Sequence, residues 1–255
     1  MADISKTPVL EIRNLTVGYG DFVVLEKLNF TVYEGEIFVI LGGSGCGKST
    51  VLKHIIGLDE PISGDIIISG ASMVNSSEQV KVDLSRKFGV LYQSGALFSS
   101  LTLEENVALP LKEFTELSPD MISSVAKLKL SLVGLEGFEH FLPSEISGGM
   151  KKRAGLARAL ALDPKILFFD EPSAGLDPIS SAELDKLILD LRENLGCTMV
   201  IVTHELDSIF SVADRVIILD KEKRGIVEEG DPRKLRENSP NEWVRKFLNR
   251  SNMRG

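Results

Sequence analysis

Four short, uninterrupted apolar runs stand out in the hydrophobic pattern of this chain. They occupy residues 37–41, 166–169, 199–202 and 216–219. Runs of this length without polar interruption are typical of strands that are buried on both faces, as in parallel sheets. We therefore predict a parallel sheet at the centre of the fold.

Residues 181–195, between two of these runs, have the pattern of an amphipathic helix. Pro178 lies near its start and Gly196 just past its end, as is typical of helix termini. A strand, a helix and a strand in this order indicate a βαβ unit, so we expect an α/β fold. The apolar positions at helical spacing are Leu184, Leu187, Ile188, Leu191 and Leu195.

The pattern predicts two further parts of the fold. Residues 9–17, 23–32 and 65–69 are strand-like and are separated by turn residues, which predicts an antiparallel layer beside the parallel core. Residues 94–157 are mostly helical in pattern and contain no buried-strand run. We therefore expect them to form a helical subdomain inserted into the α/β core.

Residues 232–255 predict a C-terminal helical tail with one apolar face. That face either docks on the core, which we favour, or binds a partner. It consists of Trp243, Val244, Phe247 and Leu248.

The composition fits a single domain that spans residues 1–255. With 255 residues and 43% hydrophobic composition, the chain can bury one sizeable core. The net charge of -8 and the lack of a basic stripe argue against nucleic-acid binding. The apolar runs are far shorter than the roughly 20 residues that cross a bilayer, so any membrane path would come from another protein.

The two cysteines and the N-terminal residues favour a cytoplasmic location. Cys46 and Cys197 have no CxxC spacing and no nearby histidine cluster, so neither a disulfide framework nor a zinc site is indicated. The first residues show neither a basic start with an apolar stretch nor transit-peptide character, so we expect no signal peptide and a bacterial cytoplasm rather than an organelle.

A glycine-rich segment follows the first apolar run and fits the pattern G-x-x-x-x-G-K-[ST]. Its glycines let the backbone curl so that successive N–H groups point at phosphate oxygens, and the following helix adds positive potential. Lys48 should reach the β- and γ-phosphates, and the Ser49 hydroxyl should ligate Mg²⁺. The alternative is a turn that binds nothing. The segment is Gly42, Gly43, Ser44, Gly45, Cys46, Gly47, Lys48, Ser49 and Thr50.

Two acidic residues end the apolar run 166–169. A carboxylate at the carboxyl end of a parallel strand points into the crevice where ligands bind. Asp170 is placed to hold Mg²⁺, and Glu171 is placed to act as general base toward the attacking water. The alternative for the pair is an ordinary pair of carboxylates before the turn at Pro172.

With these motifs, the sequence resembles the ABC ATPase family over nearly the whole chain. Tyr19 matches the aromatic residue that stacks on adenine in this family. Gln93 matches the glutamine that meets Mg²⁺ and the attacking water. His204 matches the switch histidine that contacts the γ-phosphate. Taken alone, Tyr19 would be a turn aromatic between two glycines and Gln93 would carry no signal, while His54 and His140 have no comparable motif and are expected to be structural or surface residues.

Two further segments match this family at its dimer interface. Ser147, Gly148 and Gly149 resemble the signature motif, and residues 173–177, which end at Asp177, resemble the D-loop. The resemblance implies that these four residues contact nucleotide, the signature segment through the ATP bound by the other subunit. In isolation the first of these would be only a loop or a helix start. The commonest signature has leucine and glutamine where this chain has Ile146 and Met150. The backbone donors remain, so we expect activity to survive this difference.

The resemblance implies a fold, an activity and a set of partners. The fold is that of a P-loop NTPase with a RecA-like parallel-sheet core. The activity is ATP hydrolysis with Mg²⁺. Two chains would form a head-to-tail homodimer on the cytoplasmic face of the inner membrane, with ATP in the interface. Integral membrane permease subunits would supply the path that this chain lacks.

Three segments resemble ATPases of Mla/Mce-type phospholipid transport systems in particular. They are residues 93–98, residues 106–111 and residues 147–150. This resemblance implies lipid transport, and it extends the partners to a STAS-domain protein and an Mce-domain lipid-binding protein. The alternatives are the ATPase of an importer for a small polar solute and a non-transport ABC ATPase. Leu97, Phe98 and Leu101 either line a groove for a permease helix or simply pack the helical subdomain.

The position of Cys46 suggests one further hypothesis. This thiol lies in the phosphate loop near a helix N-terminus, which favours the thiolate. We therefore expect alkylation of Cys46 to block ATP binding, and bound ATP to protect the thiol from alkylation.

Overall fold

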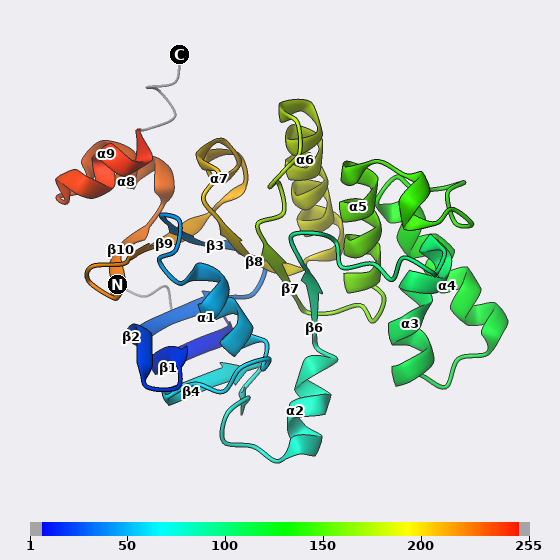
Figure 1. Cartoon of the computed structure of the whole chain (residues 1–255), viewed down its shortest axis with the longest axis horizontal. Helices are drawn as coiled ribbons and strands as arrows, with labels where there is room; N and C mark the ends of the chain where they lie inside the picture. The colour runs from blue at the N-terminus through cyan, green and yellow to red at the C-terminus, as the bar shows by residue number, and fades with distance from the viewer. Residues whose placement is uncertain (1–6, 250–255) are drawn as a thin grey trace.

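The computed structural model describes residues 7–249. Its centre is a six-stranded sheet with the strand order β10-β9-β3-β8-β7-β6 (Figure 1). Strands β9, β3, β8, β7 and β6 are parallel, and β10 pairs antiparallel with β9 at the edge. The bounds are β3 Ile37–Gly42, β6 Phe88–Leu91, β7 Ile166–Asp170, β8 Thr198–Thr203, β9 Arg215–Asp220 and β10 Gly225–Gly230.

The four apolar runs form four adjacent strands of this sheet, which confirms the predicted parallel core. They correspond to β3, β7, β8 and β9. Every residue of β3 and of β8 is buried, as expected for strands covered on both faces. Between β7 and β8 lies helix α6 (Pro178–Leu195), which Asp177 caps and which ends at Gly196 in the left-handed conformation with φ 65°. The predicted βαβ unit is therefore present.

A second, antiparallel sheet lies beside the core and also matches the prediction. Its strand order is β2-β1-β4-β5, and all its pairs are antiparallel. The bounds are β1 Pro8–Tyr19, β2 Phe22–Tyr33, β4 Ser63–Ile68 and β5 Ala71–Ser72.

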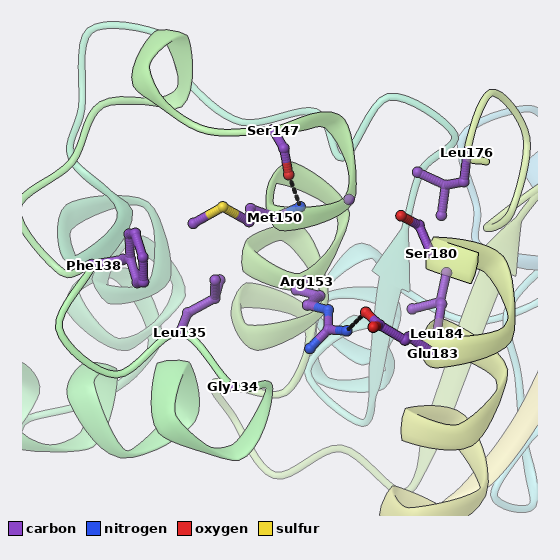
Figure 2. Close-up of a pocket in the computed structure, with 11 residues that line it drawn as sticks. Gly134, Leu135, Phe138, Ser147, Met150, Arg153, Leu176, Ser180, Glu183 and Leu184 are labelled. Atoms are coloured by element: carbon purple, nitrogen blue, oxygen red, sulfur yellow. Dashed lines mark hydrogen bonds and ion pairs between the residues drawn. The ribbon is translucent and has the colours of Figure 1, made fainter. Parts of the chain in front are cut away.

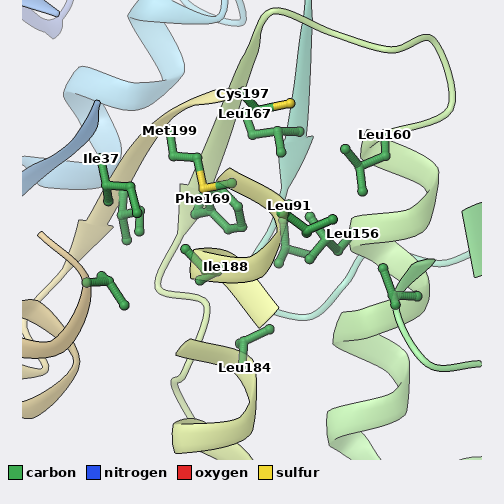
Figure 3. Packing of buried hydrophobic residues seen from close by; sticks show 14 of the residues in the cluster. Ile37, Leu91, Leu156, Leu160, Leu167, Phe169, Leu184, Ile188, Cys197 and Met199 are labelled. Atoms are coloured by element: carbon green, nitrogen blue, oxygen red, sulfur yellow. The ribbon is translucent and has the colours of Figure 1, made fainter. Parts of the chain in front are cut away.

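The central sheet separates two hydrophobic clusters, because its side chains alternate between its faces. On one face, Val39 and Leu41 belong to a cluster with residues of α5 (Gly148–Ala159) and α6. Figure 3 shows other members of this cluster, among them Leu156 of α5 and Ile188 of α6. On the other face, Phe38 and Ile40 pack with the antiparallel sheet and with α1 (Lys48–Ile55). Helices α1 and α5 therefore cover opposite faces of the sheet.

Residues 94–157 contain α3, α4, a short 3-10 helix and all but the last two residues of α5. The bounds are α3 Leu103–Phe114, α4 Pro119–Leu132, η1 Pro143–Glu145 and α5 Gly148–Ala159. A capping box starts α3, since Thr102 accepts a hydrogen bond from the Glu105 N–H while the Glu105 carboxylate accepts one from Thr102. These helices supply the inserted helical part of the expected fold class. The boundaries 94 and 157 stay a prediction.

The described part of the C-terminal tail packs on the core, the favoured of the two alternatives. Val244, Phe247 and Leu248 are buried in the same cluster as α5 and α6, whereas Trp243 is 38% exposed. Residues 250–255 lie outside the described residues. The tail helices are α8 Pro232–Asn238 and α9 Glu242–Leu248. The two helices of the core not yet given are α2 Glu78–Ser85 and α7 Leu206–Val212.

None of the helices between residues 7 and 249 combines the length and the apolar character needed to cross a membrane.

Candidate functional site

The loop between β3 and α1 has a backbone that requires glycine. Gly45 and Gly47 have φ angles of 71° and 102°, in the left-handed region that favours glycine. A Cβ atom on Gly47 would lie 2.7 Å from Val24 Cγ1 and 2.9 Å from Leu25 Cδ1. Glycine at these positions therefore permits the curled backbone of the loop. The N–H groups of the loop and of the first turn of α1 form a cradle suited to an anion.

The Lys48 ammonium lies inside this loop. Its Nζ atom donates hydrogen bonds to the carbonyl oxygens of Gly42, at 3.0 Å, and Gly43, at 3.3 Å. It is also 3.7 Å from Glu171 Oε1, and Lys48 as a whole is only 6% exposed. The first turn of α1 thus places a positive charge between the phosphate loop and the end of β7.

Ser49 and Asp170 bring two oxygen ligands together from distant parts of the sequence. The Ser49 hydroxyl donates a hydrogen bond of 2.9 Å to Asp170 Oδ1. Burial raises the pKa of the Asp170 carboxyl, and the Ser49 hydrogen bond opposes that shift. A hydroxyl beside a carboxylate fits Mg²⁺, which usually takes one or two protein ligands and completes its shell with water and substrate phosphates.

Glu171 lies between the His204 imidazole and the Lys48 ammonium. Its carboxylate oxygens are both 2.9 Å from His204 Nδ1, and one of them faces the Lys48 ammonium. The residue is 9% exposed, and its φ of 48° is unusual for a glutamate. Such backbone strain is typical of functional sites, where it amounts to roughly 1–3 kcal/mol.

The fold brings Tyr19 to the same cradle and Gln93 to the same end of the sheet. Tyr19, at the end of β1, is 51% exposed, and its hydroxyl is 3.4 Å from Thr50 Oγ1. Gln93 is exposed in the loop after β6, which pairs with β7. Both side chains are therefore exposed at the end of the sheet that carries the phosphate loop, and their contacts with nucleotide and Mg²⁺ stay predictions.

The signature segment, Ser147 to Gly149, lies at the start of α5 and away from the phosphate loop. Ser147 caps α5 by accepting a hydrogen bond of 3.2 Å from the Met150 N–H, and Gly148 and Gly149 form the first turn of that helix. This helix end borders a hollow of about 250 Å³ and faces the start of α6 (Figure 2). Because α5 and α1 cover opposite faces of the sheet, the phosphate loop and the signature segment form separate sites in one chain.

Asp177 has a structural role in this chain. Its carboxylate accepts hydrogen bonds from the N–H groups of Ile179 and Ser180, each 3.0 Å long, and from the Ser180 hydroxyl at 2.5 Å. The Ser180 hydrogen bonds lower the pKa of the Asp177 carboxyl. The structure thus uses Asp177 as the N-cap of α6, and its predicted contact with nucleotide stays a prediction.

Sequence reasoning missed two residues of α5 that contact functional loops. Lys152 Nζ donates to the Pro172 and Ala174 carbonyl oxygens, the latter at 2.6 Å, and Lys152 is 5% exposed. Arg158 donates to the carbonyl oxygens of Gly95 and Ala96, at 3.0 and 2.7 Å. Helix α5 thereby fixes the loops that follow both Glu171 and Gln93. Lys152 lies one helical turn before the buried Leu156, a spacing that could have indicated its inward face.

The premise that Cys46 is a thiolate is wrong, and the expected block of ATP binding by its alkylation stays a prediction. Cys46 is 3% exposed, and burial raises the pKa of its thiol despite the nearby Lys48 ammonium. Desolvation of the anion therefore outweighs the helix N-terminus at this position. Of the other two histidines, His54 is buried and His140 is exposed, so they occupy the structural and surface positions expected of them.

The chain is similar to known transport proteins. It is 43% identical over 240 residues to a probable ribonucleotide transport ATP-binding protein, mkl, of Mycobacterium tuberculosis, covering 94% of this chain and 66% of that protein. The chain thus spans just under two thirds of that relative's length. It is 40% identical over 227 residues to the intermembrane phospholipid transport ATP-binding protein MlaF of Haemophilus influenzae, covering 89% of this chain and 85% of MlaF.

The fold is shared with solved structures of the same type. A dimeric structure of the ATP-binding cassette MJ0796, in a post-hydrolysis state with ADP and Pi, matches with a TM-score of 0.78 and 31% identity, over 87% of this chain and 98% of that one. The family model that describes ABC transporters matches residues 25–174. With the phosphate loop, the Ser49–Asp170 pair and the Glu171–His204 pair in place, this chain belongs to the ABC transporter family of ATP-binding proteins.

Proposed function

We propose that this chain binds ATP with Mg²⁺ and hydrolyses it to drive the transport of phospholipid through a separate membrane permease. The observation that carries the hydrolytic part is the meeting of three groups at the ends of β3, β7 and β8. There the Lys48 ammonium, the Ser49–Asp170 pair and the Glu171–His204 pair surround one phosphate cradle.

Each side chain of this cradle has a chemical role in phosphoryl transfer. Lys48 and the loop N–H groups hold the phosphates, and Tyr19 offers a ring to the adenine. Ser49, Asp170 and Gln93 would hold Mg²⁺, which supplies positive charge for the phosphate oxygens when bound. Glu171 accepts a proton from the water that attacks the γ-phosphorus, while the bond to the β–γ bridging oxygen breaks and ADP leaves.

His204 orients the base and approaches the γ-phosphate in this proposal. Its Nδ1 atom already lies at hydrogen-bond distance from both Glu171 oxygens, so a small movement of either side chain alters the position of the base. Positioned charges of this kind account for most of the catalysis in phosphoryl transfer.

The opposite placement of the two anion-binding segments supports a head-to-tail homodimer. In a single chain the phosphate loop leads into α1, which covers one face of the sheet, and Ser147 caps α5, which covers the other. If both segments bind the same ATP, they come from two chains. The dimeric state of the MJ0796 cassette supports this arrangement. Asp177, at the start of α6, would then lie at the dimer interface.

A permease contact is supported by the loop that carries Phe98. Asn106 is fully buried and fixes this loop, since its side chain accepts from the Phe98 N–H at 2.8 Å and donates to the Phe98 carbonyl at 3.1 Å. The Phe98 ring is nevertheless 58% exposed, whereas Leu97 packs against the core cluster. A rigid loop that presents one large apolar ring suits a protein interface.

The phospholipid substrate is supported by the MlaF relatives. The further partners in this proposal are a STAS-domain protein and an Mce-domain lipid-binding protein. A second candidate is transport of a small polar solute, because the mycobacterial mkl relative carries a probable ribonucleotide function in its name. In both cases the chain would work at the cytoplasmic face of the inner membrane.

Two experiments test the proposal. Phosphate release by the purified wild-type chain should require Mg²⁺, and Glu171→Gln should bind ATP and form a dimer without releasing phosphate. The tagged Glu171→Gln chain should then copurify from native membranes with a permease, an Mce-domain protein and phospholipid. A solute-binding protein in their place would favour the polar-solute candidate. Wild-type phosphate release from Glu171→Gln would refute the assignment of the base.

A further inference from the structure

His204 lies in the short connection between β8 and α7. Thr203, the last residue of β8, is buried within the sheet, and α7 begins two residues after His204. Glu205 joins the two elements, since its N–H donates to the Thr203 hydroxyl at 3.1 Å and its carbonyl oxygen accepts from the Ile209 N–H at 3.2 Å. A displacement of the first turn of α7 would therefore move the backbone of His204.

The first turn of α7 is fixed by a contact with another helix rather than by a side-chain cap. Glu205 occupies the N-cap position, and within residues 7–249 its side chain makes no capping hydrogen bond. The Ser208 hydroxyl, in the same turn, donates a hydrogen bond of 2.5 Å to Asp185 Oδ1 of α6. Ser208 and Asp185 are 6% and 8% exposed, so this hydrogen bond lies inside the protein.

Apolar side chains flank this hydrogen bond on both helices. Ile209 of α7 belongs to the same buried cluster as Leu184 and Ile188 of α6. Burial raises the pKa of the Asp185 carboxyl, and the Ser208 hydrogen bond opposes that shift. Removal of the hydroxyl would leave a buried carboxyl without this donor, so the pair restricts how α7 can pack on α6.

We propose that Asp185 and Ser208 are positioning residues for the reaction. Their hydrogen bond fixes the first turn of α7 and thereby holds the His204 imidazole at the Glu171 carboxylate. The ring needs such support, since the His204 side chain is 52% exposed while its Nδ1 atom lies 2.9 Å from both Glu171 oxygens. The inference rests on the proposed roles of Glu171 as the base and of His204 as the residue that orients it.

Substitution of Ser208 in the full chain tests the proposal by its effect on ATP turnover. Ser208→Ala removes the donor and should lower kcat at least about fivefold, with KM for ATP nearly unchanged because the phosphate loop is untouched. Ser211→Ala is the matched control and should keep the wild-type kcat, since Ser211 is an exposed residue of the same helix that donates to the Asp207 carbonyl oxygen. Asp185→Asn keeps an oxygen that can accept from Ser208 and should retain most of the turnover.

Histidine NMR spectra report the environment of the His204 ring directly. The chain has three histidines, so ¹³C labelling at Cε1 gives three signals, and His204→Ala assigns the one from His204. That signal should shift in Ser208→Ala and stay unchanged in Ser211→Ala. The buried His54 and the exposed His140 serve as internal references.

The double variant His204→Ala/Ser208→Ala separates an effect through His204 from a general loss of structure. If Ser208 acts through His204, the double variant has the kcat of His204→Ala alone. Three results would overturn the proposal: a wild-type kcat in Ser208→Ala, an unchanged His204 signal in that variant, or a further loss of kcat in the double variant.

Two other results leave the decision intact. Wild-type turnover by His204→Ala would refute the role of His204 in the proposed function, and the His204 signal in Ser208→Ala would still show whether the hydrogen bond holds the ring. If Ser208→Ala does not fold, Ser208→Cys allows the same comparisons, because its thiol is a weaker donor of similar shape.

Discussion

Replacing Lys152 by methionine should impair both the fold and ATP turnover. The buried ammonium is the donor for the Pro172 and Ala174 carbonyl oxygens, which belong to the loop directly after Glu171. Methionine has a similar length but donates no hydrogen bond, so both carbonyl groups lose their donor inside the protein. Each such loss amounts to about 1–3 kcal/mol.

The net destabilisation is smaller than the sum of these two losses. Burial lowers the pKa of the Lys152 ammonium, although the Glu171 and Glu205 carboxylates oppose the shift, so the charged form is itself under strain in the fold. Removing that strain offsets part of the loss. We expect Lys152→Met to lower the free energy of unfolding by about 2 kcal/mol, and the midpoint of thermal unfolding by about 4–8 °C for a chain of this size.

The effect on turnover follows because Lys152 holds the loop next to Glu171, the proposed base. The loop that Lys152 fixes begins one residue after Glu171, whose own backbone is held in a strained conformation with φ 48°. A displacement of the base by about 1 Å lowers the rate by up to about a hundredfold. We expect kcat to fall by at least about tenfold, with little change in KM for ATP because the phosphate loop is untouched.

Phosphate release and thermal unfolding of matched variants check this reasoning. Lys152→Arg keeps donors that reach two carbonyls and should retain most activity. Lys151→Met removes a neighbouring, more exposed ammonium and should leave both kcat and stability near wild type. If Lys152→Met shows wild-type turnover and an unchanged unfolding midpoint, Lys152 does not position the loop.

Further predictions concern the buried polar groups. Burial raises the pKa of the Asp185 carboxyl, so the protonated carboxyl contributes stability at low pH that is lost as pH rises through the folded-state pKa. Asp185→Asn lacks this titrating group and should therefore lose less stability than wild type between about pH 4 and about pH 8, measured by urea titrations. Burial also raises the pKa of the Cys46 and Cys197 thiols, and both should react with Ellman's reagent at least roughly tenfold faster in urea than in the native chain; equal rates would contradict their burial. Arg215 donates to Glu36 at 2.6 Å and lies 4.7 Å from the Phe38 ring centroid, so Arg215→Lys should lower the free energy of unfolding by about 1–3 kcal/mol in chemical denaturation.

The strands that can be predicted from the sequence are those whose burial on both faces produces a continuous apolar run. Strands β3, β7, β8 and β9 are covered on both faces, and this selects continuous apolar residues. Strand β6 was missed because Gly89 interrupts its pattern. A Cβ atom there would lie 2.1 Å from the Ala159 carbonyl oxygen, so the close approach of α5 requires glycine in place of a strand-forming residue. Strand β10 is a partly exposed edge strand and has no apolar run.

The same distinction separates the site residues that could be predicted from those that could not. The phosphate loop and the Asp170–Glu171 pair are recognisable because their chemistry depends on neighbours in the sequence. Lys152 contacts the loop after Glu171 across twenty residues of sequence, so its role appears only once α5 packs against that loop. The thiolate hypothesis for Cys46 was wrong for a related reason, since the desolvation that raises its pKa depends on tertiary burial.

Helix α5 links these observations. Its first turn carries the Ser147 segment, its Lys152 holds the loop after Glu171, and its Arg158 holds the loop after Gln93. In the proposed dimer the start of α5 contacts the ATP bound by the partner chain. A shift of this helix would then displace the loops that follow Glu171 and Gln93 in its own chain, because Lys152 and Arg158 are hydrogen-bonded to the carbonyl oxygens of these loops. Hydrolysis in one site would thereby depend on nucleotide in the other through a single rigid helix.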